Sequence, residues 1–463
     1  MYKLVISEKP SVAASLSAAL GAKKREDGYF IGDGYIVSYC FGHLLELAAP
    51  DAYDEKLSKW RYDDLPIIPD KWKHVASKDK AAQLKILKEL MNRADVDCVI
   101  NGCDAGREGE NIFRLVYEHA KCKKKIMRLW ISSLEEAAIK AGFNSLKDGK
   151  EYDNLYAAAS CRERADWLVG ISATRLFSVI YGQTLNTGRV QSPTLAMLVK
   201  READIAAFVK EPFYTVNIDL DSFIASSDRT KEKREAEAIR AACDGKTAVV
   251  RSVERQKKTA APPKLYDLTT LQREANRLFG FTAAQTLEYA QSLYEKAIIS
   301  YPRVDSRYLT SDMRGTAGAI VEWIQKDMEY KDGADFKPDI DRLINDAKVS
   351  DHHAIIPTFG IMKADIAALP SGECDIVNLI AYRLLCAAAP AHIYEAVTAV
   401  LDCEGYSFSA KGKTVIEDGW KAIDTAFKAS LKSKPENEDG EDDTALPELS
   451  KGQTFDSVSA AVK

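Results

Sequence analysis

Several features that define large classes of protein are missing from this sequence of 463 residues. No apolar run reaches the roughly 18 residues that a membrane-spanning helix needs. The nine cysteines form no Cys-x-x-Cys pair, which argues against a zinc ribbon. No Walker A loop is present, because Ser407 and Arg240 stand where Gly412-Lys-Thr and Gly245-Lys-Thr would need the first glycine. The sequence therefore gives no support to an ATP-driven motor.

The composition is that of a globular protein with more than one core. Apolar residues make up 46% of the chain, and its length leads us to expect roughly three or four subdomains. The N-terminus, Met1-Tyr-Lys-Leu-Val-Ile-Ser, has too short an apolar run for a signal peptide. An odd, scattered set of cysteines is typical of reduced thiols, so we expect a cytoplasmic location.

Charge is distributed unevenly along the chain. A net charge of −5 argues mildly against nucleic acid, because binding to phosphates needs a basic field. The segment Glu436–Asp443 is strongly acidic, however, whereas Arg162, Arg164, Arg175 and Arg189 lie close together in the sequence. The local field decides binding, so a nucleic-acid partner stays open.

The first 150 residues are expected to form an α/β domain. The patterns predict buried strands over 3–7 and 97–101, helices over 11–20, 80–93 and 110–119, and a strand over 127–132. Two strands that are each followed by a helix indicate a parallel sheet with a site at the carboxyl ends of its strands.

Beyond residue 150 the expected elements are more mixed. Residues 151–207 and 269–389 have mainly helical patterns, and 228–243 is expected to be a surface helix. Strands are predicted over 212–220, 247–253, 394–403 and 406–409, and linkers over 259–264 and 431–443.

Carboxylates follow both predicted N-terminal strands. Glu8 comes after the first, and Asp104, Glu108 and Glu110 come after the second. Clustered carboxylates suit Mg²⁺, which prefers oxygen ligands and can orient a phosphodiester. The structural alternative is that Glu8 caps a helix and that Arg107-Glu-Gly-Glu is a solvated turn.

One tyrosine stands out among 20, because Tyr301 ends an apolar run immediately before Pro302. A neutral phenol is a weak nucleophile, so attack on phosphorus needs nearby cations, and Arg303 can hold a phosphate oxygen. The pair His352-His353 could bind phosphate or assist proton transfer. The structural alternatives are a buried tyrosine before a turn, and one exposed and one packed histidine.

Taken together, these segments resemble those of the type IA DNA topoisomerases, especially the bacterial topoisomerase III branch. The resemblance runs in order from Leu4 to about Thr358, and the matching segments lie in the Toprim, strand-binding and active-site regions. They are Glu8-Lys-Pro, Phe41-Gly-His-Leu-Leu-Glu, Lys59-Trp-Arg, Leu65-Pro-Ile, Asp104-Ala-Gly-Arg-Glu-Gly-Glu, Arg162-Glu-Arg-Ala-Asp-Trp, Gly188-Arg-Val-Gln-Ser-Pro-Thr, Leu271-Gln, Gln291-Ser-Leu-Tyr-Glu, Ser300-Tyr-Pro-Arg-Val-Asp-Ser and His352-His-Ala-Ile-Ile-Pro-Thr.

The resemblance implies a multidomain α/β and α+β toroid. It would contain a Toprim domain (1–150), a helical DNA-binding domain (151–212), a β-rich hinge domain (213–265 and 395–463, with the acidic linker 431–443) and a helical tyrosine domain (266–394). We expect the toroid to be incomplete, with the second segment of the DNA-binding domain missing after residue 463.

The resemblance also implies an activity and a set of roles. Tyr301 would cleave single-stranded DNA through a 5′-phosphotyrosine bond, with Arg303, Glu8, Lys9 and His352 as the other catalytic residues. Mg²⁺ would be held by Glu8, Asp104 and Glu108. The residues implied to contact DNA are His43, Arg61, Arg162, Arg164, Asp166, Arg175, Thr187, Gly188, Arg189, Val190, Gln191, Ser192 and His353.

The implied partner is single-stranded or underwound DNA, without ATP or a membrane. We expect a monomer associated with the nucleoid or a mobile element. Relaxation of negative supercoils and decatenation would follow from strand passage.

Two positions depart from the family pattern. Gly106 replaces an acidic residue, so we expect weaker or more water-mediated Mg²⁺ binding, and Val304 replaces a threonine at the cost of a hydrogen bond. Gly106 and the C-terminal end also favour a non-catalytic DNA-binding remnant as an alternative. A Toprim nuclease, in which water attacks, would explain the acids but leave the Tyr301 segment without a role.

Overall fold

A computed structural model describes residues 1–327, 335–349, 352–431 and 446–463. The chain forms two compact units, each described by itself below. The first comprises Met1–Ala207, Leu287–Asp305 and Val349–Val377, and the second comprises the remainder. Of the predicted acidic linker 431–443, all but Leu431 lies outside the described residues. No helix in the described ranges combines the length and apolar character that crossing a membrane requires.

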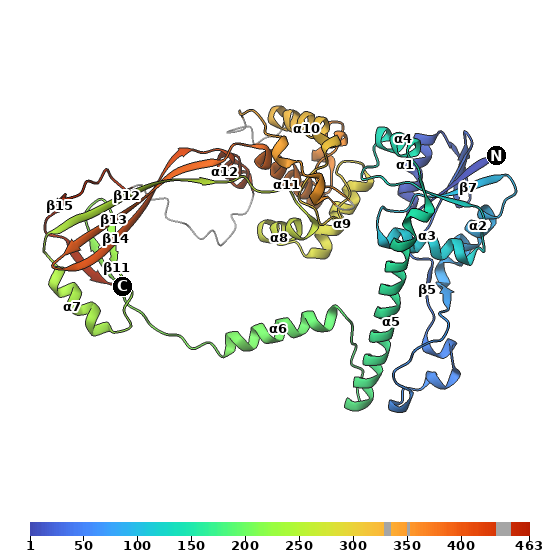
Figure 1. Cartoon of the computed structure of the whole chain (residues 1–463), viewed down its shortest axis with the longest axis horizontal. Coiled ribbons are helices and arrows are strands. Elements are labelled where there is room, and N and C mark those ends of the chain that lie inside the picture. Colours follow the sequence, from blue (N-terminus) through green and yellow to red (C-terminus); the bar gives the residue numbers. More distant parts are fainter. Residues whose placement is uncertain (328–334, 350–351, 432–445) are drawn as a thin grey trace. The chain divides into compact units, whose positions relative to one another are not determined.

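The first unit is built around a seven-stranded sheet of order β2-β3-β4-β1-β7-β8-β9 (Figure 1). Its four central strands run parallel, and the strands at both edges are antiparallel to their neighbours. The strands are β1 (Tyr2–Ser7), β2 (Lys24–Glu26), β3 (Tyr29–Gly32), β4 (Tyr35–Tyr39), β7 (Val96–Asn101), β8 (Lys125–Arg128) and β9 (Lys147–Asp148).

The helices of this α/β part are α1 (Pro10–Leu20), α2 (Ala81–Met91), α3 (Arg107–His119) and α4 (Glu136–Asn144). Helix α1 ends at Leu20, as predicted, and Gly21 follows in a left-handed conformation with φ 75°. Fully buried Leu4, Ile6, Val99 and Phe113 join strands and helices in one core, so burial of apolar area stabilises the parallel pairing.

Two boundaries differ from the sequence prediction. Helix α3 begins at Arg107 rather than at residue 110, so Glu108 and Glu110 lie in its first turn. Strand β8 ends at Arg128, and residues 129–132 leave the sheet. The carbonyl of Ser132 instead accepts a hydrogen bond from the backbone N–H of Tyr301, at 3.1 Å.

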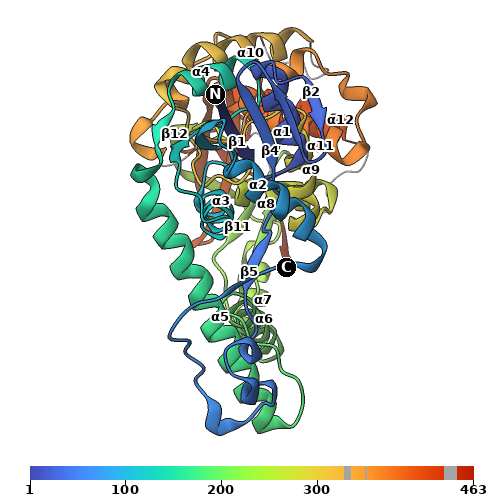
Figure 2. The same cartoon turned by 90° about the vertical axis from the view of Figure 1, so that its right-hand side faces the viewer.

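A long helix, α5 (Asp153–Tyr181), leaves the sheet, and α6 (Gln191–Ala206) follows it. Residues 45–76, with β5 (Leu45–Leu47) and β6 (His74–Ala76) at their ends, run alongside α5 (Figure 2). The Trp167 indole donates to the Ala48 carbonyl at 3.0 Å, and the Ser172 hydroxyl accepts from the Ile67 N–H at 3.3 Å. These hydrogen bonds hold residues 45–76 against α5.

The tyrosine segment follows α9 (Ala283–Glu295) and completes the first unit. A short bridge pairs Ile299 with Pro357, and the Ser300 N–H donates to the Ile356 carbonyl at 2.9 Å. A 3-10 helix, η9 (Phe359–Met362), comes next, and α11 (Ser371–Ala388) begins in this unit.

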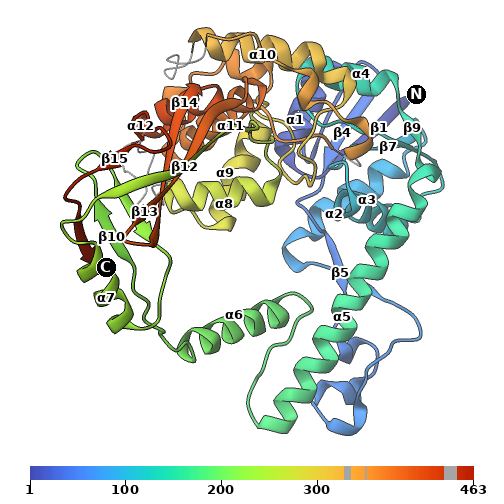
Figure 3. The ribbon, with the colours of Figure 1, turned by 60° about the vertical axis from the view of Figure 1, so that its left-hand side comes forward.

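The second unit contains a seven-stranded sheet of order β15-β12-β13-β14-β11-β10-β16 (Figure 3). The strands are β10 (Val216–Asp219), β11 (Ile224–Ser227), β12 (Ala248–Ala260), β13 (His392–Cys403), β14 (Tyr406–Glu417), β15 (Thr454–Phe455) and β16 (Ser459–Val462). The helices are α7 (Lys233–Cys243), α8 (Leu268–Phe279), α10 (Arg314–Asp327) and α12 (Trp420–Ser430).

The predicted linker 259–264 is wrong at its start, because Thr259 and Ala260 pair with Ile393 and His392 as the end of β12. Strand β14 also continues eight residues beyond the predicted end at Ser409, to Glu417 (417 − 409 = 8). Backbone pairing with β13 sustains both extensions, although the side chains there are largely polar. The division of these elements into four domains stays a prediction.

A buried ionic network lies beneath the carboxyl end of β7. Glu110, only 1% exposed, accepts from the Asn101 amide and from Arg114, both at 2.8 Å, and lies 3.2 Å from Arg128. Its partner Arg128 is equally buried. Glu110 is therefore a structural carboxylate, although the sequence grouped it with the metal-binding acids.

This network generates a stability prediction. Glu110→Gln leaves the buried Arg128 guanidinium without its counter-charge, so we expect the free energy of unfolding to fall by about 3 kcal/mol. The matched control is Glu108→Gln, two residues away, whose side chain is 60% exposed and whose loss should cost within about 0.5 kcal/mol. Urea denaturation followed by circular dichroism measures both, and equal effects would contradict the assignment.

Candidate active site

Two buried carboxylates that interact electrostatically lie at the ends of neighbouring parallel strands. Glu8 follows β1 and Asp104 follows β7, and they are 4% and 7% exposed. Burial raises the pKa of Glu8 to about 7, and the negative charges of Asp104 and Glu108 add to that rise. Burial likewise raises the pKa of Asp104. The two acids therefore repel each other in a poorly solvated site.

One oxygen of each acid has no hydrogen-bond partner, namely Glu8 Oε2 and Asp104 Oδ2. Buried polar atoms are normally paired, so two neighbouring unpaired carboxylate oxygens fit a divalent cation. The third expected ligand, Glu108, is 60% exposed and lies 3.9 Å from His43 and 3.8 Å from Arg303. In the described part of the chain, no three metal-binding side chains converge on one point. Water or substrate oxygens would have to complete the shell.

The loop that carries Asp104 is held by Arg128, which the sequence analysis did not single out. Its guanidinium donates to the carbonyls of Cys103 and Asp104, both at 2.7 Å, and to that of Asn101 at 3.1 Å. These charge-assisted bonds fix the backbone of the loop. Arg128 is thus a positioning residue, and its only sequence signal is a charge at the end of an apolar strand.

Tyr301 lies beside these acids. Its side chain is buried, and its pKa is raised first by burial and then by the negative charge of Asp104. Arg303 opposes that rise through its charge and a hydrogen bond to the phenol. The phenol is therefore neutral near pH 7, and deprotonating it requires a base or added positive charge.

His352 packs against Tyr301, with ring centroids 4.7 Å apart, and stacks on Trp130. Its Nε2 bonds to the Ala105 carbonyl, which can only accept, so this nitrogen carries the proton. Its Nδ1 then accepts from the Ser132 hydroxyl at 2.8 Å. Both ring nitrogens are engaged, so His352 links the tyrosine segment to two loops of the sheet.

Lys9 pairs with a residue that the sequence analysis missed. Its ammonium lies 2.9 Å from Glu295 Oε1, and the second Glu295 oxygen accepts from the Ser11 hydroxyl at 2.9 Å. Gln291 also donates to Glu295, at 3.0 Å. Glu295 belongs to the quoted segment Gln291-Ser-Leu-Tyr-Glu, so the motif could have revealed it.

The expected DNA contacts divide into an exposed set and a buried set. On α5, Asp166 lies 3.9 Å from Arg162 and 2.5 Å from Arg189 of the following loop, and all three side chains are exposed. Arg164 lies over the Trp72 ring at 5.6 Å. The remaining expected contacts at the surface of this unit are His43, Arg61, Thr187, Gly188, Val190, Gln191 and Ser192.

Arg175 and His353 are placed differently. Arg175 is 7% exposed and donates to the Leu57 carbonyl at 2.6 Å, with its guanidinium over Trp60. His353 is buried and its Nδ1 bonds to the Ala354 carbonyl. We therefore infer that Arg175 holds residues 57–60 against α5, and that neither Arg175 nor His353 contacts DNA directly.

Two family models match this chain. The family model of the Toprim domain matches residues 3–134, and that of DNA topoisomerase matches residues 150–463. A protein named DNA topoisomerase 3 from Bacillus subtilis is 42% identical to this chain, in an alignment that covers 98% of this chain and 63% of the relative. A protein of the same name from Shouchella clausii is 38% identical, and the alignment covers 97% of this chain and 62% of the relative.

A solved structure also matches. Full-length topoisomerase I from Thermotoga maritima aligns with a TM-score of 0.72 at 22% identity, covering 99% of this chain and 71% of that one. At that identity the likeness shows the fold alone. The chain spans about 63% of the length of the Bacillus subtilis relative.

The metal site yields a prediction at Gly106. Its φ of 173° is extended, and a Cβ there would meet nothing within 4 Å, so Gly106→Asp should add a ligand without strain. We expect the midpoint of a Mg²⁺ titration, measured by calorimetry, to fall roughly tenfold. Gly106→Asn, equal in size but uncharged, is the control. A wild-type midpoint as low as that of Gly106→Asp would refute the expectation.

The different environments of Arg162 and Arg175 lead to a prediction about DNA binding. Arg162→Ala should weaken binding of labelled oligonucleotides regardless of sequence and reduce the salt slope by about 1. Arg175→Ala should leave that slope unchanged while lowering the melting temperature, because its partner is a backbone carbonyl. Fluorescence anisotropy over a KCl series measures the slopes. A sequence-selective loss in Arg162→Ala, or a reduced slope in Arg175→Ala, would count against these roles.

Proposed function

Because this chain belongs to the type IA DNA topoisomerase family, we propose that it cleaves and reseals single-stranded DNA with Tyr301 as the nucleophile. The observation that carries the proposal is the burial of the Tyr301 phenol beside Glu8, Asp104 and Arg303. A structural tyrosine has no need of two poorly solvated acids and an arginine. Such a constellation suits a phosphodiester whose charge must be balanced while the phenol attacks.

Cleavage would exchange one phosphate ester bond for another. The phenol oxygen forms a bond to phosphorus, and the bond from phosphorus to the 3′ oxygen breaks, leaving a 5′-phosphotyrosine and a free 3′-hydroxyl. Glu8 would accept the phenol proton and return a proton to the leaving oxygen. Resealing reverses these transfers, and the ester conserves the bond energy, so no ATP is required.

The remaining residues bind and orient. Arg303 would hold a non-bridging phosphate oxygen, and Lys9, which Glu295 orients at 2.9 Å, would direct its ammonium to the phosphate. Glu8 and Asp104, with Glu108 through water, would hold Mg²⁺, which when bound offsets the negative charge developing on the phosphate. Arg162, Arg164 and Arg189 would grip the backbone of a single strand without selecting its sequence.

Strand passage through the opened break would give relaxation and decatenation. We extend this proposal to a monomer that acts in the cytoplasm, on the nucleoid or a mobile element. The relatives at 38–42% identity are named DNA topoisomerase 3, which supports the assignment of this chain to that branch.

A labelling experiment tests the nucleophile. We expect denaturant to trap a covalent complex with a 3′-end-labelled oligonucleotide in Mg²⁺, while a 5′-end label is released on a shortened strand. Tyr301→Phe should abolish the complex. Tyr294→Phe, a buried tyrosine whose ring lies 5.3 Å from that of Tyr301, is the matched control and should retain it.

Other outcomes have distinct meanings. Cut strands without attached protein would indicate water as the nucleophile, as in a Toprim nuclease. Binding without any cleavage would indicate a DNA-binding remnant. Either result would overturn the proposed function.

A further inference from the structure

A row of aromatic rings connects the Toprim part of the first unit with the tyrosine segment. Tyr152 and Trp130 are stacked, with ring centroids 5.1 Å apart and planes 20° from parallel. Trp130 lies within 10° of parallel to His352, at 6.0 Å, and His352 packs against Tyr301 at 4.7 Å. These spacings are those of interacting aromatic pairs. The row therefore runs without a break from the residue before α5 to the proposed nucleophile.

The Toprim end of this row is firmly held. The Arg128 guanidinium lies 5.1 Å from the centre of the Trp130 ring and 5.9 Å from that of Tyr152, and a cation over aromatic rings adds attraction. Arg128 is itself fixed by its bonds to carbonyls of the loop that carries Asp104. Tyr152 ends a 3-10 helix, η5 (Gly149–Tyr152), which begins with a capping box. Trp130 thus rests on residues whose own positions are fixed.

The two hydrogen bonds at the His352 ring nitrogens fix its position but not its plane. The Nε2 donates to the Ala105 carbonyl, and the Nδ1 accepts from the Ser132 hydroxyl at 2.8 Å. These bonds define a line within the ring, and they allow the ring to tilt about that line. The parallel stack on Trp130 opposes the tilt, because tilting opens a gap between the two rings. His352 then presents a fixed surface to the ring of Tyr301.

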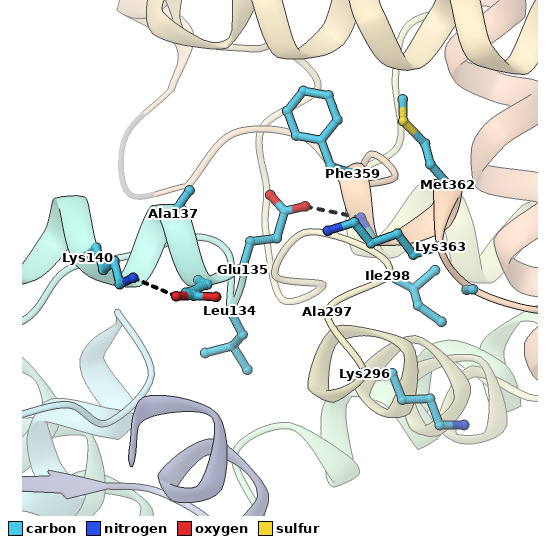
Figure 4. Close-up of a pocket in the computed structure, with 13 residues that line it drawn as sticks. Leu134, Glu135, Ala137, Lys140, Lys296, Ala297, Ile298, Phe359, Met362 and Lys363 are labelled. Atoms are coloured by element: carbon cyan, nitrogen blue, oxygen red, sulfur yellow. Dashed lines mark hydrogen bonds and ion pairs between the residues drawn. The ribbon is translucent and has the colours of Figure 1, made fainter. Parts of the chain in front are cut away.

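The neighbouring part of the same junction is hollow. A cavity of about 920 Å³ lies between the segment 134–140 and residues 296–298 and 359–364 (Figure 4). The Glu135 carboxylate crosses from one side to the other and accepts a hydrogen bond from the Gly360 N–H at 3.1 Å. Because side chains do not fill the space beside it, packing on that side contributes little to the orientation of Tyr301. The orientation depends more on the contacts made through His352.

The row also relates the phenol to the acids of the candidate active site. Tyr294 packs edge-on against Tyr301 at 5.3 Å, but it belongs to α9, which leads into the tyrosine segment itself. Trp130 instead follows a strand of the sheet that carries Glu8 and Asp104. A contact through Trp130 therefore places the phenol relative to the acids rather than relative to its own segment.

We propose that Trp130 is a positioning residue for DNA cleavage, which acts through His352 on the orientation of the Tyr301 phenol. The inference rests on the proposed function, because it assigns a role in the cleavage step. An attacking atom must lie close to phosphorus and in line with the leaving oxygen, and small displacements slow such steps strongly. Trp130 makes no contact with DNA in this role, so its loss slows cleavage without weakening binding.

Single-turnover cleavage tests this role. With the 3′-end-labelled oligonucleotide at saturation, Trp130→Leu should lower the rate of adduct formation about tenfold, the size expected for one lost aromatic pair. Its dissociation constant for the oligonucleotide, measured by fluorescence anisotropy, should stay that of the wild type. Trp130→Phe keeps a ring in the row and should recover most of the rate.

Phe143→Leu is the matched control. Phe143 on α4 is half-buried like Trp130 and packs edge-on against Tyr35 at 5.7 Å, in the same unit but outside the row. We expect its loss to leave the cleavage rate unchanged. Equal losses of rate in Phe143→Leu and Trp130→Leu would indicate general destabilisation, and weaker binding at an unchanged rate would make Trp130 a DNA contact. Either result would overturn the proposal.

Histidine NMR tests the contact without cleavage. The chain has 6 histidines, and His352→Gln identifies the His352 Cε1–H resonance. The ring current of a stacked indole shifts this resonance upfield, so Trp130→Leu should move it downfield. Glu135→Ala, which removes the hydrogen bond to Gly360 at the same junction, should leave it in place. An unmoved resonance in Trp130→Leu would refute the proposal.

A double variant tests the order of the row. Tyr152→Leu removes the ring stacked on Trp130 and should slow cleavage about threefold. In the Trp130→Leu background it should add nothing, because Tyr152 acts through Trp130. Additive losses would contradict that order. An absent covalent adduct in the wild type would sink the proposed function, whereas the His352 resonance still decides whether Trp130 holds that ring.

Discussion

The parallel pairing of β1 with β7 is the constraint on which the candidate active site depends. It places the residues after both strands at one edge of the sheet, so Glu8 and Asp104 meet although 96 positions separate them (104 − 8 = 96). Their repulsion and desolvation oppose folding, as the raised pKa of each carboxyl indicates. The apolar core between sheet and helices provides the favourable free energy that offsets this cost.

A buried ion pair between Glu110 and Arg128 stabilises the same edge of the sheet. Glu110 compensates Arg128, and Arg128 in turn holds the carbonyls of the loop that presents Asp104. Removal of either partner would leave an uncompensated charge in the core, which is far more costly than removal of an exposed charge. The motif Asp104-Ala-Gly-Arg-Glu-Gly-Glu therefore contains two kinds of acid, Asp104 in the candidate active site and Glu110, which maintains the loop.

The tyrosine segment is attached to this edge by few but varied contacts. Tyr301 is bonded through its backbone to Ser132, His352 spans Ser132 and Ala105, and Glu295 pairs with Lys9. Under the proposed function, these contacts orient Tyr301 at a junction that separates for strand passage.

The sequence by itself determined the element types around the site and the identity of its chemical groups. Apolar periodicity located β1, α1 and β7, because local burial patterns encode those elements, and the motifs singled out Tyr301, Glu8 and Asp104. Only the tertiary structure decided which charges face solvent and which are buried. Arg175 and Arg162 occur in the same helix, yet one is bonded to the Leu57 carbonyl and the other is exposed. Likewise, β12 extends beyond its apolar pattern because it pairs with β13, a strand distant in the sequence, and β14 extends because it pairs with β13, the preceding strand, along its whole length. The burial of a side chain and the pairing of a strand depend on neighbours that only folding brings together, and local sequence patterns do not identify those neighbours.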